Sequence, residues 1–108
     1  MPAVQLDGHA LTDWAGFHQT CKQALGFPAF YGGNMDAWID CLSGLRDGDG
    51  MSAFRLAPDE MLQIQVLHSD VLRREAPEIL SALEECAAEV NQLYVENGKK
   101  PAVGLVLR

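Results

Sequence analysis

The chain has few basic residues, and this shortage limits what it can bind directly. It carries 8 lysines and arginines against 15 aspartates and glutamates, which gives a formal net charge of −7. Nucleic-acid binding needs a basic surface, so we expect no nucleic-acid partner. The acidic charge does suit a basic protein partner, because complementary fields speed and orient the encounter.

Long apolar runs and a secretory signal are also missing. No apolar stretch approaches the length of a transmembrane helix, and the first residues lack a basic segment followed by an apolar core. We therefore expect a cytoplasmic protein without membrane contact. Cys21, Cys41 and Cys86 are an odd number and fall on predicted helices. This pattern favours reduced, mostly buried thiols over a disulfide framework.

The residues present predict one domain over residues 1–108. Hydrophobic residues make up 48% of the chain, which is enough for a packed core. Their spacing predicts three strands, at 3–6, 62–67 and 102–107. Capping and stop signals predict four helical segments: from Thr12 to Gly26, from Asn34 to near Arg46, a short turn through Val71 and Leu72, and from Pro77 to Asn97.

Strands separated by helices are typical of an α/β fold with a parallel sheet and right-handed crossovers. We expect two layers, with a three-stranded parallel sheet packed against helices. The run 102–107 (AVGLVL) is nearly all apolar, which is typical of a strand covered on both faces. The apolar pattern alone therefore places the last strand in the middle of the sheet.

The segment 27–44 (FPAFYGGNMDAWIDCLSG) is an aromatic loop that leads into a helix. Asn34 is a good N-cap after the flexible Gly32-Gly33 pair. A buried stripe is predicted on one side of the helix: Met35, Trp38, Ile39, Leu42 and Leu45. Asp36, Asp40 and Ser43 fall on the opposite side, with Gly44 beside them. That side is either an ordinary solvated face or a binding surface.

This segment resembles the barstar family, the intracellular inhibitors of the secreted ribonuclease barnase. The matching residues are His18-Gln19-Thr20, Lys22, Leu25, Pro28, Tyr31-Gly32, Asn34, Asp36-Ala37, Asp40-Cys41-Leu42 and Ser43-Gly44. The resemblance implies a barstar-like fold with strand order 1-2-3. It also implies inhibition of a basic ribonuclease, with the loop and helix in the active-site cleft and carboxylates in place of RNA phosphates.

The resemblance carries specific roles onto this sequence. Asp40 takes the position of the dominant acidic contact and Asp36 that of the second. Phe30 takes the position of an aromatic that packs on a cleft histidine, and Tyr31 holds the loop. The full set of implied partner-binding residues is Phe30, Asn34, Asp36, Ile39, Asp40, Ser43, Gly44 and Glu85. On the last helix Glu84 and Glu89 remain alternatives to Glu85.

The sequence departs from the family pattern at four contact positions. Ile39 replaces an exposed tryptophan, Gly33 an acid, Leu45 an aromatic residue, and Phe30 a tyrosine. The resemblance then implies a partner related to barnase but different from it. The free protein is expected to be a monomer. A barstar-fold module that binds another basic protein, or itself, is the alternative.

Enzymatic and metal-binding interpretations are less favoured. Asp36 and Asp40 could form a carboxylate pair, but no nucleophile has an adjacent base and no phosphate loop is present. His18, Cys21 and Cys41 lack zinc-ligand spacing. The run 47–52 (DGDGMS) resembles the start of a calcium loop without its later ligands. We therefore expect no catalysis, no cofactor and no metal.

Overall fold

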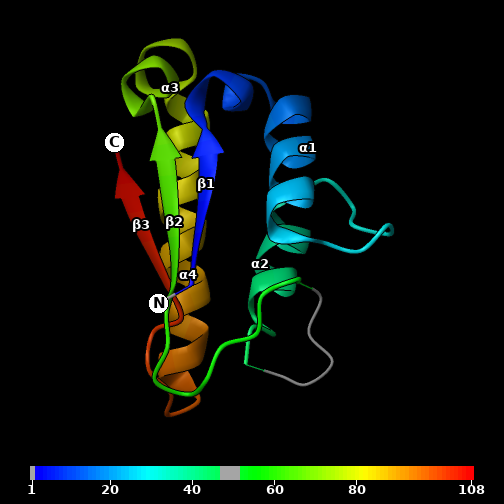
Figure 1. Cartoon of the computed structure of the whole chain (residues 1–108), viewed down its shortest axis with the longest axis vertical. Coiled ribbons are helices and arrows are strands. Elements are labelled where there is room, and N and C mark those ends of the chain that lie inside the picture. The colour runs from blue at the N-terminus through cyan, green and yellow to red at the C-terminus, as the bar shows by residue number, and fades with distance from the viewer. Residues whose placement is uncertain (1, 47–51) are drawn as a thin grey trace.

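The computed structural model describes residues 2–46 and 52–108. Its elements follow one another along the chain: β1 (Ala3–Asp7), the 3₁₀ helix η1 (Gly8–Leu11), α1 (Trp14–Leu25), α2 (Met35–Leu42), β2 (Leu62–Leu67), α3 (Ser69–Glu75), α4 (Pro77–Glu96) and β3 (Val103–Leu107). Figure 1 shows α4 behind the sheet and α1 and α2 beside it. The predicted two-layer α/β fold with a three-stranded parallel sheet is confirmed.

The sheet has the order β1-β2-β3, and both pairings are parallel. In β2 the residues Leu62, Ile64 and Val66 are buried, whereas the alternate residues Gln63 and Gln65 are only half-buried. The Gln5 side-chain amide of β1 donates to the Gln65 side chain at 3.2 Å. One face of the sheet therefore carries glutamines, and the opposite face meets the helices.

The prediction that the last strand is covered on both faces and lies in the middle is wrong. β3 is an edge strand, and its residues 104–107 are half-buried. Leu105 and Leu107 pair with Ile64 and Val66, so they lie on the core face. The glutamine-bearing face receives only Gly104 and Val106. The apolar run was misleading because glycine contributes no side chain to bury.

The first helix begins one residue later than predicted, with Asp13 rather than Thr12 as its N-cap. The Asp13 carboxylate accepts from the Gly16 backbone N–H at 2.6 Å. The unpredicted η1 precedes it and displaces Thr12 from the cap. Trp14, predicted on the apolar face, is 41% exposed and stacks on His18 instead. Phe17, Cys21 and Leu25 do lie in the core as predicted: all three are fully buried.

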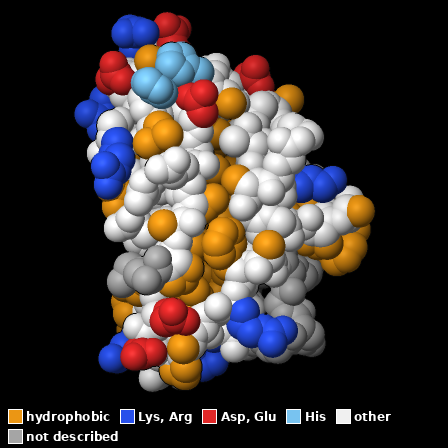
Figure 2. All heavy atoms as spheres, in the orientation of Figure 1, with side chains coloured by type: hydrophobic (Ala, Val, Ile, Leu, Met, Phe, Trp, Pro, Cys, Tyr) orange, Lys and Arg blue, Asp and Glu red, His pale blue; other side chains and the backbone are white. Residues whose placement is uncertain are grey.

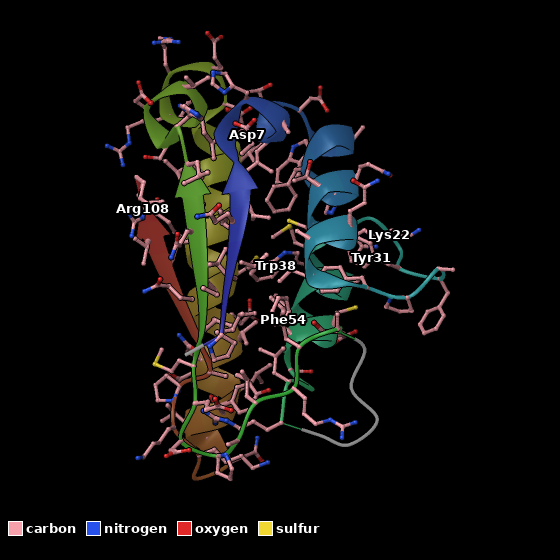
Figure 3. All side chains as sticks on the ribbon, viewed as in Figure 1. Asp7, Lys22, Tyr31, Trp38, Phe54 and Arg108 are labelled. Atoms are coloured by element: carbon pink, nitrogen blue, oxygen red, sulfur yellow. The ribbon has the colours of Figure 1, made fainter. Side chains whose placement is uncertain are left out.

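The core lies between the sheet and the helices. Trp38 of α2 is fully buried, and Figure 3 shows it pointing from α2 toward the sheet. Leu42 and Leu45 are also fully buried, while Met35 and Ile39 of the same predicted stripe pack at the margin of the core. Burying large apolar side chains contributes roughly 1.5–3 kcal/mol each, so this stripe fixes the orientation of α2.

Helix α2 ends at Leu42, and residues 43–46 continue as turns rather than as helix. The glycine-rich segment 47–52, considered above for calcium, lies outside the described residues except for Ser52. Within the described part of the chain, no helix has the length and apolar character to cross a membrane.

Candidate functional site

The loop before α2 is anchored by buried and half-buried aromatic side chains, and one further aromatic ring is exposed to solvent. Gly26 adopts φ +66°, as expected for a helix stop, and Phe27 beyond it is buried. The Tyr31 hydroxyl bonds to His18 Nδ1 at 2.7 Å, and its ring lies 4.8 Å from that of Phe27. Phe30, at the tip, is 77% exposed. Phe30 is therefore exposed to solvent in a loop whose neighbouring residues, Phe27 and Tyr31, are held in place by packing and hydrogen bonding.

The start of α2 is built by local hydrogen bonding. Gly33 has φ +66°, and Asn34 follows in extended conformation as the N-cap. The Asn34 side-chain oxygen accepts from the Ala37 backbone N–H at 2.8 Å. This confirms the predicted cap. The amide NH₂ of Asn34 and the second lone pair of its side-chain oxygen are left to contact a partner.

Asp36 and Asp40 lie one turn apart on the exposed face of α2. Within residues 2–46 and 52–108, neither carboxylate has a cation within ion-pair distance or a side-chain hydrogen bond. Asp36 gains some stabilisation from the positive end of the helix dipole. Asp40, a turn further along, gains little, because that field falls off within the first turn. The two charges repel each other by roughly 0.2–0.5 kcal/mol.

The end of α2 is fixed by a long-range contact to α4. The Tyr94 hydroxyl accepts from the Leu45 backbone N–H at 3.0 Å and donates to the Ser43 carbonyl at 2.8 Å. The Arg46 guanidinium lies 5.0 Å over the Tyr94 ring. Ser43 Oγ donates to the Asp40 carbonyl at 2.7 Å. Ser43 and Gly44, both half-buried, are thus positioned directly after Asp40 by the packing of two helices.

Helix α4 brings further carboxylates beside this face. Burial raises the pKa of the Cys86 thiol, and three neighbouring negative charges raise it further: those of Glu89, Glu85 and Asp36. Helices α2 and α4 pack against each other, and Asp36 of α2 is close enough to Cys86 of α4 to influence its thiol. At 100° per residue, Glu89 lies on the same flank of α4 as Cys86, Glu85 lies next to it facing solvent, and Glu84 lies on the opposite flank.

A comparison with known protein families identifies the family of this chain. The family described as Barstar (barnase inhibitor) matches the chain over residues 1–106. The chain belongs to the barstar family. Nearly the whole domain matches, so the segment 27–44 stands in its expected structural context. A barnase-inhibitor-like role is thereby supported at the level of the family.

The barstar-family residues named from the sequence mostly come together. Phe30, Asn34, Asp36 and Asp40 are exposed along the loop and the outer side of α2. Ile39 is half-buried, so it offers only part of its side chain. Leu45 is fully buried and cannot replace the aromatic contact that the family has at this position. Among the glutamates of α4, Glu89 and Glu85 lie near Cys86, whose thiol Asp36 also influences, whereas Glu84 lies on the opposite flank of the helix.

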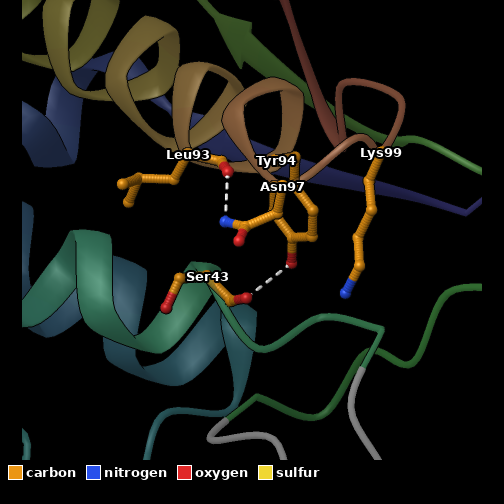
Figure 4. Close-up of a pocket in the computed structure, with 5 residues that line it drawn as sticks. All are labelled: Ser43, Leu93, Tyr94, Asn97 and Lys99. Atoms are coloured by element: carbon orange, nitrogen blue, oxygen red, sulfur yellow. Dashed lines mark hydrogen bonds between the residues drawn. The ribbon is translucent and has the colours of Figure 1, made fainter.

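A pocket beside Ser43 was not predicted from the sequence. It has a volume of about 260 Å³ and lies between the ends of α2 and α4. The lining residues are Ser43, Leu93, Tyr94, Asn97 and Lys99. Figure 4 shows Asn97 bonded to the Leu93 carbonyl, at 2.7 Å, and the Lys99 side chain at the rim. No spacing signal could reveal this pocket, because Ser43 is about fifty residues from the other four.

The cysteines offer no reactive thiolate in the described structure. All three are free, as predicted; Cys21 and Cys41 are buried and Cys86 is half-buried. Burial raises the pKa of Cys21 to about 12, which disfavours the thiolate that nucleophilic attack or zinc binding requires. Within the described residues, His18, Cys21 and Cys41 do not bring three ligand atoms together.

Proposed function

We propose that this protein inhibits a basic ribonuclease related to barnase by inserting the loop 27–34 and the outer face of α2 into its active-site cleft. One observation carries the proposal. Asp36 and Asp40 stand on the exposed side of a rigidly packed helix, and the described residues supply no cation to either. A cationic partner is the natural complement of such a face.

The chemistry of the cleft makes the match specific. A ribonuclease binds RNA phosphate through arginine, lysine and histidine donors, and carboxylates accept charge-assisted hydrogen bonds from the same groups. Asp40 is the proposed central contact, because it lies on the exposed face of α2 between the loop and the Ser43-Gly44 turn. Asp36 and, from α4, Glu89 or Glu85 extend the negative surface toward the start of α2.

The apolar part of the surface is proposed to anchor the loop. Phe30 is 77% exposed, and covering such a ring contributes roughly 1.5–3 kcal/mol. Ser43 and Gly44 are proposed to approach the partner through hydroxyl and backbone groups. The free thiols suit a reducing compartment, so we propose that the protein acts in the cytoplasm and is a monomer when free. We also propose that its inhibitory face needs neither a cofactor nor catalytic activity.

The test is a titration of the protein into a panel of basic microbial ribonucleases, barnase included, with RNA cleavage as the readout. We expect inhibition at one-to-one stoichiometry with one of them. Asp40→Ala should weaken that inhibition by at least ~2 kcal/mol, or about 30-fold, as for a charge that meets a buried cationic site. Asp59→Asn is the matched control, because it removes one charge from an exposed turn outside α2.

The same assay resolves the contribution of α4. Glu89→Gln should weaken inhibition more than Glu84→Gln, because the two side chains lie on opposite flanks of one helix. Equal effects of Asp40→Ala and Asp59→Asn would refute the assignment of the site. Absence of inhibition across the panel would refute the ribonuclease as partner.

The alternative is a barstar-fold module that binds another basic protein or associates with itself. The observation in its favour is Leu45, which is fully buried at a position where the family has an aromatic contact. Analytical ultracentrifugation would detect self-association directly. A dimer that Phe30→Ala dissociates would support this alternative over ribonuclease inhibition.

A further inference from the structure

A second cluster of functional side chains lies at the end of the sheet, apart from the acidic face of α2. Asp7 is the last residue of β1, His9 follows in η1, and His68 comes directly after β2. Asp7 pairs with Leu67 across the sheet, so the two strand ends lie side by side. Figure 2 shows histidine side chains beside acidic ones where β1 and β2 end, and Figure 3 labels Asp7 there.

The three side chains approach one another closely. His9 Nδ1 lies 3.0 Å from Asp7 Oδ1, and the rings of His9 and His68 are 4.6 Å apart between centroids. One ligand atom from each residue fits within 4.8 Å of the other two. Within the described parts of the chain, no other group of three histidine, cysteine or acidic residues meets this criterion.

The backbone around the cluster is tightly built. A Cβ atom at Gly8 would lie 2.5 Å from the His68 carbonyl oxygen and 2.6 Å from that of Leu67, so only glycine allows η1 to sit against the end of β2. His68 has φ 53° and is the one non-glycine residue with positive φ in the described structure. This strained conformation is uncommon outside glycine. Together the two features hold His68 against His9.

We propose that Asp7, His9 and His68 bind a divalent transition-metal ion of the Zn²⁺ class. Two imidazoles and one carboxylate are a common ligand set for such ions. Tetrahedral ligands about 2.0 Å from zinc are separated by about 3.3 Å, so the existing distances need only small side-chain rotations. All three side chains are exposed, and water can complete the coordination.

The surroundings of Asp7 suit a ligand. Its Oδ1 accepts from the His9 backbone N–H at 3.0 Å, which orients the carboxylate. An aspartate carboxylate is ionised at neutral pH, as metal binding requires. The competing interpretation is that Asp7 serves only as the N-cap of η1.

The proposal is tested by titrating the full-length protein with Zn²⁺ by calorimetry and with Co²⁺ by absorption spectroscopy. We expect one ion per chain. His68→Asn keeps a residue that tolerates positive φ but removes the imidazole, and His9→Gln removes the second ring. Each should weaken binding at least ~10-fold. Asp7→Asn keeps an oxygen for the cap while removing the charge, so it separates capping from metal binding.

Two controls complete the design. The Cys86→Ser variant should bind Zn²⁺ with unchanged affinity, and this result would exclude the half-buried thiol as a ligand. NMR of the histidine rings should show Zn²⁺ shifting His9 and His68 but not His18, which is bonded to Tyr31. Absence of saturable binding, or binding that survives His9→Gln and His68→Asn but not Cys86→Ser, would overturn the proposal. If His68→Asn does not fold, the exposed His9→Gln variant decides. None of these measurements involves a ribonuclease.

Discussion

Removal of the Tyr94 hydroxyl would test how the end of α2 is held. The hydroxyl joins α4 to the turn after α2 through the Leu45 N–H at 3.0 Å and the Ser43 carbonyl at 2.8 Å. Tyr94 is 5% exposed and Leu45 is fully buried. In Tyr94→Phe the ring remains, with its contact to Arg46, while these bonds and the longer one from the hydroxyl to the Leu42 carbonyl, at 3.1 Å, are lost. The variant therefore isolates the hydroxyl from the packing.

The expected loss follows from burial. The bond to the Ser43 carbonyl contributes about 1 kcal/mol net, and leaving the buried Leu45 N–H without a partner costs roughly 1–3 kcal/mol. Water has little access to the Leu45 N–H, so we expect unfolding free energy to fall by about 2–4 kcal/mol. At about 4 °C per kcal/mol for a domain of this size, Tm should fall by roughly 10 °C.

Chemical denaturation by urea, followed by circular dichroism, measures this loss. Tyr31→Phe is the matched control, because its hydroxyl bonds to His18 at a half-buried position where water can substitute. We expect that variant to lose about 1 kcal/mol or less. Equal losses in the two variants, or a loss below 1 kcal/mol for Tyr94→Phe, would refute the argument that this hydroxyl fixes the turn.

Two further predictions follow from the loop before α2. Phe30→Ala should change unfolding free energy by less than ~0.5 kcal/mol, because the ring is exposed, yet weaken partner affinity about tenfold or more, as isothermal titration calorimetry would show. Burial lowers the pKa of His18 below its unfolded value of 6.5. Its contribution to stability is then complete above pH 6.5 and is lost as pH falls through the folded pKa. Thermal melts between pH 8 and pH 5 should therefore show a smaller decline in His18→Gln than in the unmodified protein; equal declines would contradict the prediction.

The parts of the fold that depend on local signals could be predicted from the sequence. Strand β2 alternates apolar and polar residues and begins and ends where predicted. Pro77 begins α4, and Asn34 caps α2. The exposed face of α2 follows from helical spacing alone, which is why Asp36 and Asp40 could be recognised together. Such features depend on residues within one or two turns of each other.

One local turn and several contacts made by tertiary packing could not be predicted. The Asp7 side chain accepts from the His9 N–H and begins η1, a turn that the pattern of apolar residues does not encode. The contact of Tyr94 with Ser43 and the meeting of His9 with His68 each join residues that are more than forty positions apart. The edge position of β3 came from the family resemblance, against the apolar pattern.

The two sides of α2 explain why the proposed site needs this fold. Two aspartates one turn apart repel each other and are weak helix formers, so α2 has little intrinsic stability as an eight-residue helix. Burial of Trp38 and Leu42 on the inner side outweighs that penalty, and the Asn34 cap and the Tyr94 hydroxyl secure the two ends. The carboxylates are therefore held in place before any partner arrives. A cationic cleft that meets them gains their full attraction without the entropic cost of ordering the helix.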